Sequence, residues 1–257
     1  MAPRGLKALL RKSSPAKLAG SGSWKGFQSL KTKRKLKGLT KRLKDKVWSD
    51  GILPLIARNA DPSIRDKGCW KGKMGGQRRG TKVDQQLSKL INGGKMAIMR
   101  QKNMFKLTRL ALSAMAKRGL DPVMAQRAVI SEEKGLGTAA DVIAFDKATN
   151  RLVVVELKCG YDHGRQAAAE KGGRPCKMRG PCGKALDSNV HRHLAQLSVT
   201  RELMAREKDT LKKVGDLGVD QNVEGVLMYV NDAGVEFYPL DTWWQGRGSK
   251  LIQAIAA

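Results

Sequence analysis

The chain has 257 residues, of which 41% are hydrophobic and 5% are aromatic, and its formal net charge at pH 7 is +27. This length is enough for one domain of about 150–200 residues with an extension. A positive charge of this size predicts a polyanionic partner. No apolar run approaches the roughly 18 residues of a membrane-spanning helix, which favours nucleic acid over membrane as that partner. The four cysteines form no even disulfide framework, so a reducing compartment is expected.

Residues 1–44 contain fourteen lysines or arginines and no acidic residue. The most compact basic cluster includes Lys33, Arg34 and Lys35. This composition predicts a disordered arm over residues 1–60 that binds phosphates without sequence preference or directs the protein to the nucleus. A mitochondrial presequence is the alternative, because such segments are also poor in acids and contain serine. Lysine outnumbers arginine here, so we favour the nucleus or another DNA-containing compartment.

A basic, glycine-rich stretch at residues 72–80 is predicted to be a flexible loop. It is not a P-loop, because no Gly-Lys-Ser/Thr follows it. A helix is predicted to begin at about Thr81, with apolar residues recurring on one face, and to end at Asn92, where two glycines follow. Asp84 lies at the edge of that face. Three nearby basic residues would bring phosphates to the same place: Arg78, Arg79 and Lys82.

Two β-rich runs, at residues 142–145 and 152–155, flank a short turn formed by residues 147–150. If the turn is a symmetric hairpin loop, Asp146 faces Arg151 across it. Residues directly opposite in an antiparallel pair project from the same face, with their Cβ atoms about 5 Å apart. The sequence therefore predicts a β-hairpin whose register can be counted back from the turn.

Counting back places Asp141 opposite Glu156, and Lys158 shares their face because it lies two residues past Glu156. Like charges placed opposite each other destabilise a sheet, and buried carboxylates are unfavourable. A divalent cation removes this conflict, since Mg²⁺ is typically held by one or two carboxylates plus substrate phosphate oxygens. The alternative is a hairpin whose charged end faces solvent, with Lys158 neutralising Glu156.

An aspartate on one strand followed by Glu-x-Lys at the end of the next, here Asp141 and residues 156–158, resembles the core motif of the PD-(D/E)XK nuclease superfamily. Ala140 precedes the aspartate where the signature has proline, a departure that is common in the superfamily. The resemblance implies that Asp141 and Glu156 bind Mg²⁺ or Mn²⁺ directly, with the Leu157 carbonyl as a third ligand. Lys158 would orient the attacking water or stabilise negative charge on the phosphate.

The resemblance covers about residues 78–240. Superfamily branches that resemble phage-type exonucleases and RecB-like nucleases carry a glutamine on the helix after the Glu-x-Lys strand. Gln196 matches it on a helix predicted over residues 189–207, and His193, a candidate nucleic-acid contact, shares its face. The alternative is two solvent-facing polar residues. The implied fold for residues 61–257 is α/β: a restriction-endonuclease-like core with a central mixed β-sheet flanked by helices.

An acidic residue on a helix before the sheet often completes the metal shell in this superfamily. Asp84 is the candidate, and the alternative is an ordinary aspartate that stabilises the first turn of its helix. Glu132 and Glu133 follow a strand predicted over residues 127–131 and are the other acids open for this role.

Further elements complete the expected order. They are a helix over residues 101–118, a closing hairpin over residues 223–230 and 235–240, and a short terminal helix over residues 251–257. Residues 159–184 are rich in glycine and basic residues, and we expect a mobile loop there that binds substrate phosphates. Cys176, Cys182, His191 and His193 could be drawn as a zinc set, but their spacings are not standard for zinc.

The resulting expectation is metal-dependent hydrolysis of phosphodiester bonds in nucleic acid, with DNA favoured over RNA. An exonuclease in DNA processing, recombination or repair is one form of it. The alternative is a non-catalytic protein that binds or packages nucleic acid, which the charge alone supports equally well. That alternative does not explain two carboxylates and a lysine on one face of one hairpin.

Overall fold

The computed structural model describes residues 1–19, 26–33, 35–51, 53, 75–93, 104–159 and 165–256. Side chains at residues 17–19, 26, 37 and 75–78 are not described. Arg34 and the side chain of Arg78, both predicted to contact nucleic acid, lie outside this described part.

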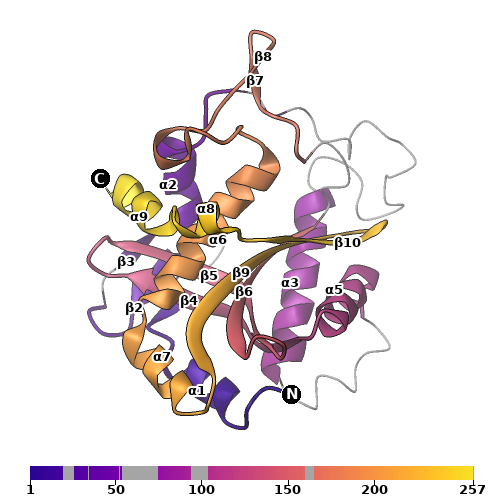
Figure 1. Ribbon diagram of the computed structural model, residues 1–257, viewed down its shortest axis with the longest axis vertical. Coiled ribbons are helices and arrows are strands. Elements are labelled where there is room, and N and C mark those ends of the chain that lie inside the picture. The colour runs from indigo at the N-terminus through magenta and orange to yellow at the C-terminus, as the bar shows by residue number, and fades with distance from the viewer. Residues whose placement is uncertain are drawn as a thin grey trace.

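A five-stranded mixed sheet forms the centre of the protein (Figure 1). Its strands are β4 (Leu120–Ser131), β5 (Leu136–Asp146), β6 (Arg151–Cys159), β9 (Asp220–Asn231) and β10 (Gly234–Pro239), in that spatial order. Neighbouring strands are antiparallel except for β6 and β9, which are parallel. A parallel pair needs a long crossover, and the segment between β6 and β9 supplies it with α6 (Asn189–Ala205) and α7 (Lys208–Gly215). The expected mixed α/β class with a central sheet is confirmed.

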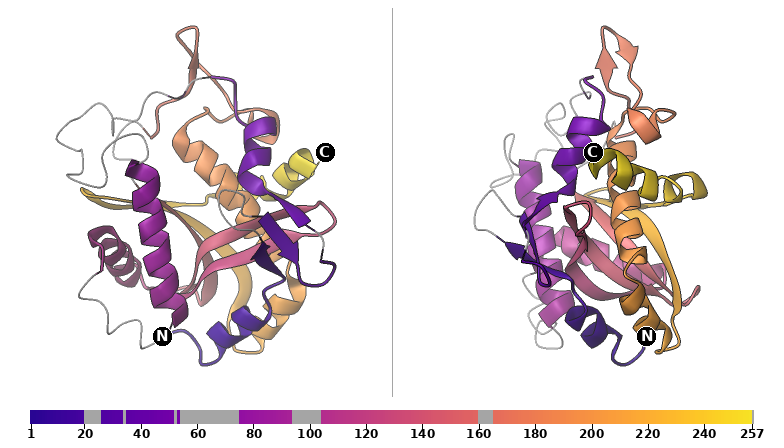
Figure 2. Two further views of the ribbon diagram at one scale, coloured as in Figure 1. Left: turned by 180° about the vertical axis from the view of Figure 1, so that it is seen from behind. Right: turned by 90° about the vertical axis from the view of Figure 1, so that its left-hand side faces the viewer.

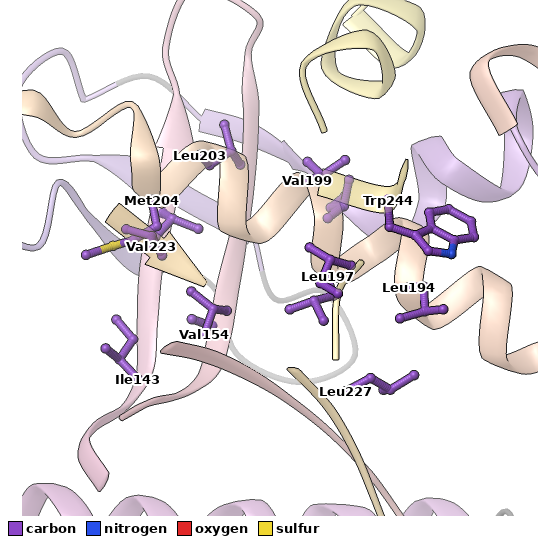
Figure 3. Packing of buried hydrophobic residues seen from close by; sticks show 14 of the residues in the cluster. Ile143, Val154, Leu194, Leu197, Val199, Leu203, Met204, Val223, Leu227 and Trp244 are labelled. Atoms are coloured by element: carbon purple, nitrogen blue, oxygen red, sulfur yellow. The ribbon is translucent and has the colours of Figure 1, made fainter. Parts of the chain in front are cut away.

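Helices cover both faces of this sheet (Figure 2). On one face, α3 (Gly75–Gly93) and α5 (Lys106–Lys117) pack Val83 and Leu107 into a cluster with Val153 and Val155 of β6. On the other face, α6 packs against the alternate side of β6, including Val154 (Figure 3). Burial on both faces explains why β6 is a nearly continuous apolar run.

The N-terminal segment differs from the predicted disordered arm. Its described residues form α1 (Leu6–Lys12), β1 (Ala16–Ala19), β2 (Gly26–Ser29), β3 (Lys35–Gly38) and α2 (Leu39–Lys46). β3 pairs in parallel with the start of β5, and Leu10 and Leu43 are fully buried in the cluster that contains α6. Little in the sequence indicates these two short helices, because each buries only two leucines, one turn apart, among many lysines. Lys33 and Lys35 are exposed.

Two further boundaries also differ from the prediction. Helix α3 begins at Gly75, so residues 75–80 are helical and not a loop; glycines are poor helix formers, which is why the sequence favoured a loop. Strand β4 begins at Leu120, seven residues before the predicted start. Its pairing with β5 shifts between Pro122 and Met124, because proline interrupts a regular ladder.

The segment after β6 contains a small hairpin, β7 (Glu170–Lys171) and β8 (Arg174–Pro175), and a 3-10 turn, η3 (Gly180–Cys182). The hairpin projects from the body of the protein at the top of Figure 1. The chain closes with α8 (Thr242–Gln245) and α9 (Gly248–Ala256), the latter packed on α6. Within the described residues, no helix is both long enough and apolar enough to cross a bilayer.

Candidate functional site

The β5–β6 hairpin turns at the predicted place, but the expected pairing of Asp141 with Glu156 is not part of its ladder. Asp146 faces Arg151 as expected, and the ladder runs back from there to Val142 opposite Val155, where it ends. Beyond this point β5 continues toward its parallel pairing with β3. Past the end of the ladder the Asp141 side chain still connects β5 to β6, because its Oδ2 accepts a hydrogen bond from the Leu157 N–H at 2.9 Å.

Glu156 is the most enclosed charged group of the site, with its side chain fully buried. Its Oε1 atom accepts hydrogen bonds from Lys158 Nζ at 2.5 Å and from Gln196 Nε2 at 2.6 Å. Its Oε2 atom is also buried, and it has no hydrogen-bond partner among the residues that the structure describes. A buried carboxylate oxygen without a partner is strongly unfavourable, so this atom requires an explanation.

The environment disfavours two negative charges here. Burial raises the pKa of the Glu156 carboxyl from about 4.5 to about 8, and the charges of Asp141 and Asp84 add to the rise while Lys158 opposes it. Burial also raises the pKa of Asp141, against the effect of Lys158 and of the Leu157 N–H. A bound cation favours the charged form of a neighbouring carboxyl. The pair is therefore best suited to full ionisation beside an additional positive charge.

The donors at the open end fit a hard divalent cation. Asp141 and Glu156 Oε2 supply carboxylate oxygens, and one or two carboxylates are the usual protein contribution to Mg²⁺. In an extended strand the N–H and C=O of one residue point to the same edge. Since the Leu157 N–H bonds to Asp141, the Leu157 carbonyl lies on that edge as well. An all-oxygen set of this kind suits Mg²⁺ or Mn²⁺.

Asp84 approaches the site from α3, on the other face of the sheet. Its charge raises the pKa of both Glu156 and Cys159, which places it near the open end of the hairpin. Within the described part of the chain, however, no three Asp, Glu, His or Cys side chains converge closely enough to hold a metal ion. Asp84 thus acts on the site through its charge in this structure.

Glu132 and Glu133 lie elsewhere. They occupy the turn between β4 and β5, about 17 Å along β5 from Asp141 at 3.3 Å per residue. Glu132 accepts a hydrogen bond from the Ser29 hydroxyl, and the exposed Glu133 pairs with Lys134. The structure brings neither acid to the hairpin opening.

His193 faces the site from α6 with Gln196. Its Nδ1 atom shares a hydrogen bond of 2.7 Å with the Tyr229 hydroxyl, and Tyr229 is the β9 residue paired with Lys158. Burial, together with the positive charges of Lys158 and Arg192, lowers the pKa of His193 well below 6.5. This environment disfavours the charged form of the imidazole.

The other predicted phosphate contacts near α3 have internal partners. The buried Arg79 pairs with Asp232 at 2.5 Å, and the exposed Lys82 ammonium lies 5.2 Å from the centre of the Phe105 ring. Arg79 thus fixes α3 to the β9–β10 turn. Of the two, Lys82 is the side chain that solvent and substrate can reach.

The sequence did not indicate two residues beside the site. Gln126 of β4 donates from Nε2 to Asp141 Oδ1 at 3.3 Å, but β4 was predicted to begin one residue later. Arg165 lies 4.9 Å from the Tyr229 ring, donates to the Tyr238 hydroxyl at 3.2 Å and pairs with Glu236. Its place in a loop of irregular structure gave no pattern that could have predicted these contacts.

The possible zinc set does not assemble. Cys182 is buried with a thiol pKa raised to about 12, and His191 bonds through Nδ1 to the Leu186 carbonyl at 2.7 Å. His193 is directed to Tyr229 instead. Residues two apart on a helix do not face each other, and no metal cluster is found among the described residues.

Comparisons with known proteins leave the family open. No protein-family model matches the chain, and a search of curated proteins finds no match.

Proposed function

We propose that this protein is a metal-dependent nuclease that hydrolyses phosphodiester bonds, with DNA as the favoured substrate. The observation that carries the proposal is the buried Glu156 carboxylate, whose Oε2 atom has no hydrogen-bond partner among the described residues, with Asp141 near enough for its charge to act on Glu156. A purely structural carboxylate in that position would be expected to have both oxygens satisfied.

The order of the elements supports the proposal. A helix, α3, precedes three antiparallel strands, and a helix carrying Gln196 follows before the parallel strand β9. Apart from the additional helices α5 and α7, this order resembles the one expected of a restriction-endonuclease-like core, with the Asp and Glu-x-Lys motifs on the second and third of these strands. Gln196 reaches Glu156 directly, as expected from the resemblance to phage-type exonucleases and RecB-like nucleases.

Each residue of the site would have a separate role. Asp141, Glu156 and the Leu157 carbonyl would hold Mg²⁺ or Mn²⁺, which when bound polarises a phosphoryl oxygen and lowers the pKa of a coordinated water. Gln196 and Lys158 hold Glu156 Oε1, which leaves Oε2 available to a cation. The Lys158 ammonium places a positive charge where the phosphoryl oxygens gain negative charge during the displacement.

The charge distribution supports a nucleic-acid substrate. Exposed lysines follow the N-terminal segment from β3 into α2, which packs on the same core as the site: Lys33, Lys35, Lys41, Lys44 and Lys46. Such a surface binds the phosphate backbone through counterion release, so its affinity falls with salt.

The test is cleavage of a labelled DNA duplex with and without Mg²⁺. We expect the wild type to cut only with the metal and the Glu156→Gln protein to lose at least about 100-fold in rate. Glu224→Gln is the matched control, because Glu224 lies on β9 and pairs with Arg151 at the other end of the hairpin. Equal cleavage by wild type and Glu156→Gln would refute the assignment. Tight binding without any cleavage would instead support a non-catalytic binding or packaging protein.

A further inference from the structure

Strand β4 contains a backbone irregularity at Gln126. This residue has a φ of 54°, which lies in the left-handed region that residues other than glycine seldom adopt inside a strand. The residues before and after Gln126 point to opposite faces of the sheet. Ala125 packs in the cluster that contains α3, whereas Arg127 bonds to α1 and to Glu207. In a regular strand these two neighbours would lie on one face.

The surroundings hold this irregular backbone from both sides. The Asn92 side chain of α3 bonds to both the N–H and the C=O of Ala125, at 3.0 and 2.9 Å. The fully buried Arg127 guanidinium bonds to both oxygens of Glu207, at 2.8 and 2.6 Å. A strained conformation persists only where its surroundings determine it in this way, and such positions concentrate at functional sites.

Gln126 lies opposite Asp141, between the pairs Ala125–Val142 and Arg127–Ala140, and its side chain bonds to that carboxylate. Gln126 Nε2 donates to Asp141 Oδ1 at 3.3 Å, while the Leu157 N–H donates to Oδ2 at 2.9 Å. Each carboxylate oxygen thus has one donor, and the two donors come from the strands on either side of β5. This arrangement fixes the rotation of the carboxylate while it leaves further lone pairs for another ligand.

We propose that Gln126 is a positioning residue that orients Asp141 for a divalent cation. The inference rests on the proposed function, because it assigns Asp141 to the metal. Groups that orient a metal ligand change metal affinity by about 10- to 100-fold when they are removed. Gln126 does not touch the reacting atoms, so its effect should appear in the metal dependence first.

Two substitutions separate this role from a purely structural one. Gln126→Gly removes the hydrogen bond and relieves the backbone strain, whereas Gln126→Ala removes the hydrogen bond and keeps the strain. We expect Gln126→Gly to melt at a temperature at least as high as Gln126→Ala in the absence of metal. Both should need about 10-fold or more Mn²⁺ for half-maximal cleavage, with rates at saturating Mn²⁺ close to wild type.

The experiment measures two quantities for each protein: the rise in melting temperature with Mn²⁺, and the Mn²⁺ dependence of duplex cleavage. Asn150→Gly is the matched control, because Asn150 has φ of 57° in the β5–β6 turn, away from Asp141. The inference is supported if both Gln126 variants need more Mn²⁺ in both measurements and Asn150→Gly does not. It is overturned if the wild type responds to Mn²⁺ and the Gln126 variants respond at the same concentrations. A wild type that neither binds Mn²⁺ nor cleaves would overturn the proposed function, and the inference with it.

Discussion

Both ends of the β5–β6 hairpin carry carboxylates and a basic side chain, but these groups are partly exposed at the turn and largely buried at the open end. At the turn, Arg151 donates to Asp220 and to Glu224, each at 2.8 Å, and about a third of each side chain is exposed. Asp146 accepts from the Ala148 N–H at 2.9 Å and so stabilises the turn itself. Every carboxylate there has a partner and access to water.

At the open end the charged side chains are largely buried. Glu156 is fully buried with one oxygen that lacks a partner among the described residues, and Lys158 is about one-fifth exposed. The pKa of Glu156 rises to about 8 here, whereas hydrogen bonds to Asn222 and Arg151 lower the pKa of Asp220 at the turn. Perturbation by burial marks functional carboxylates more often than structural ones, and the comparison therefore distinguishes the two ends.

The largest difference is expected in catalysis. Lys158→Ala should lower the rate of Mg²⁺-dependent DNA cleavage by about 100- to 1,000-fold, the range for losing a group that stabilises developing charge. Arg151→Ala, which removes a cation from the other end, should change the rate by less than about threefold. Single-turnover cleavage at saturating Mg²⁺ measures both. Equal losses in the two variants would remove the distinction between the ends.

A second difference is expected in the pH dependence of stability without metal. Because the folded protein holds the Glu156 proton up to about pH 8 while the unfolded chain releases it near pH 4.5, ionisation of Glu156 destabilises the fold progressively across that range. Glu156→Gln removes this effect. Its free energy of unfolding should exceed that of the wild type by a few kcal/mol above pH 8, on the order of 1.4 kcal/mol per unit of pKa shift.

Below about pH 4.5 the advantage of Glu156→Gln should vanish, since the wild-type carboxyl is then protonated in both states. Denaturant unfolding at pH 5 and pH 8.5 measures the change. A constant difference between the two proteins would show that Glu156 does not ionise within this range.

The smallest difference is expected at the turn. Arg151→Ala should lower the free energy of unfolding by less than about 1 kcal/mol, because partly exposed ion pairs contribute little. The loss should shrink further at 0.5 M NaCl through screening. Chemical denaturation at two salt concentrations tests this, and a loss above 2 kcal/mol would mean that the turn pairs are as important as buried ones.

The sequence was sufficient for the hairpin and for its register from the turn to Val142 opposite Val155, but not for the end of the ladder before Asp141. A four-residue turn between two apolar runs leaves one symmetric pairing, and Asp146 does face Arg151. Local patterns with a fixed period carry this kind of information well. Gln196 was predicted from the resemblance to a nuclease superfamily with a glutamine on the helix after the hairpin, and its amide reaches Glu156.

Other features of the site depend on contacts that no local pattern encodes. Glutamine has no marked preference for the left-handed region, so nothing at Gln126 indicates its backbone. Asn92, and Glu207 through its pair with Arg127, hold it from distant parts of the chain. The N-terminal leucines stand among lysines in the sequence. Their burial depends on partner surfaces made by β4 and α7 for α1, and by α6 and α9 for α2. Tertiary context of this kind overrides composition and propensity.

The central claim is that the open end of the hairpin holds a divalent cation through Glu156. Isothermal titration of Mn²⁺ into wild type and into Glu156→Gln at pH 8 tests it most directly. We predict saturable binding by the wild type with release of protons, since binding ionises a carboxyl whose pKa is raised to about 8. We predict no saturable binding by Glu156→Gln at the same concentrations. Equal Mn²⁺ binding by both proteins, or none by the wild type, would contradict the claim.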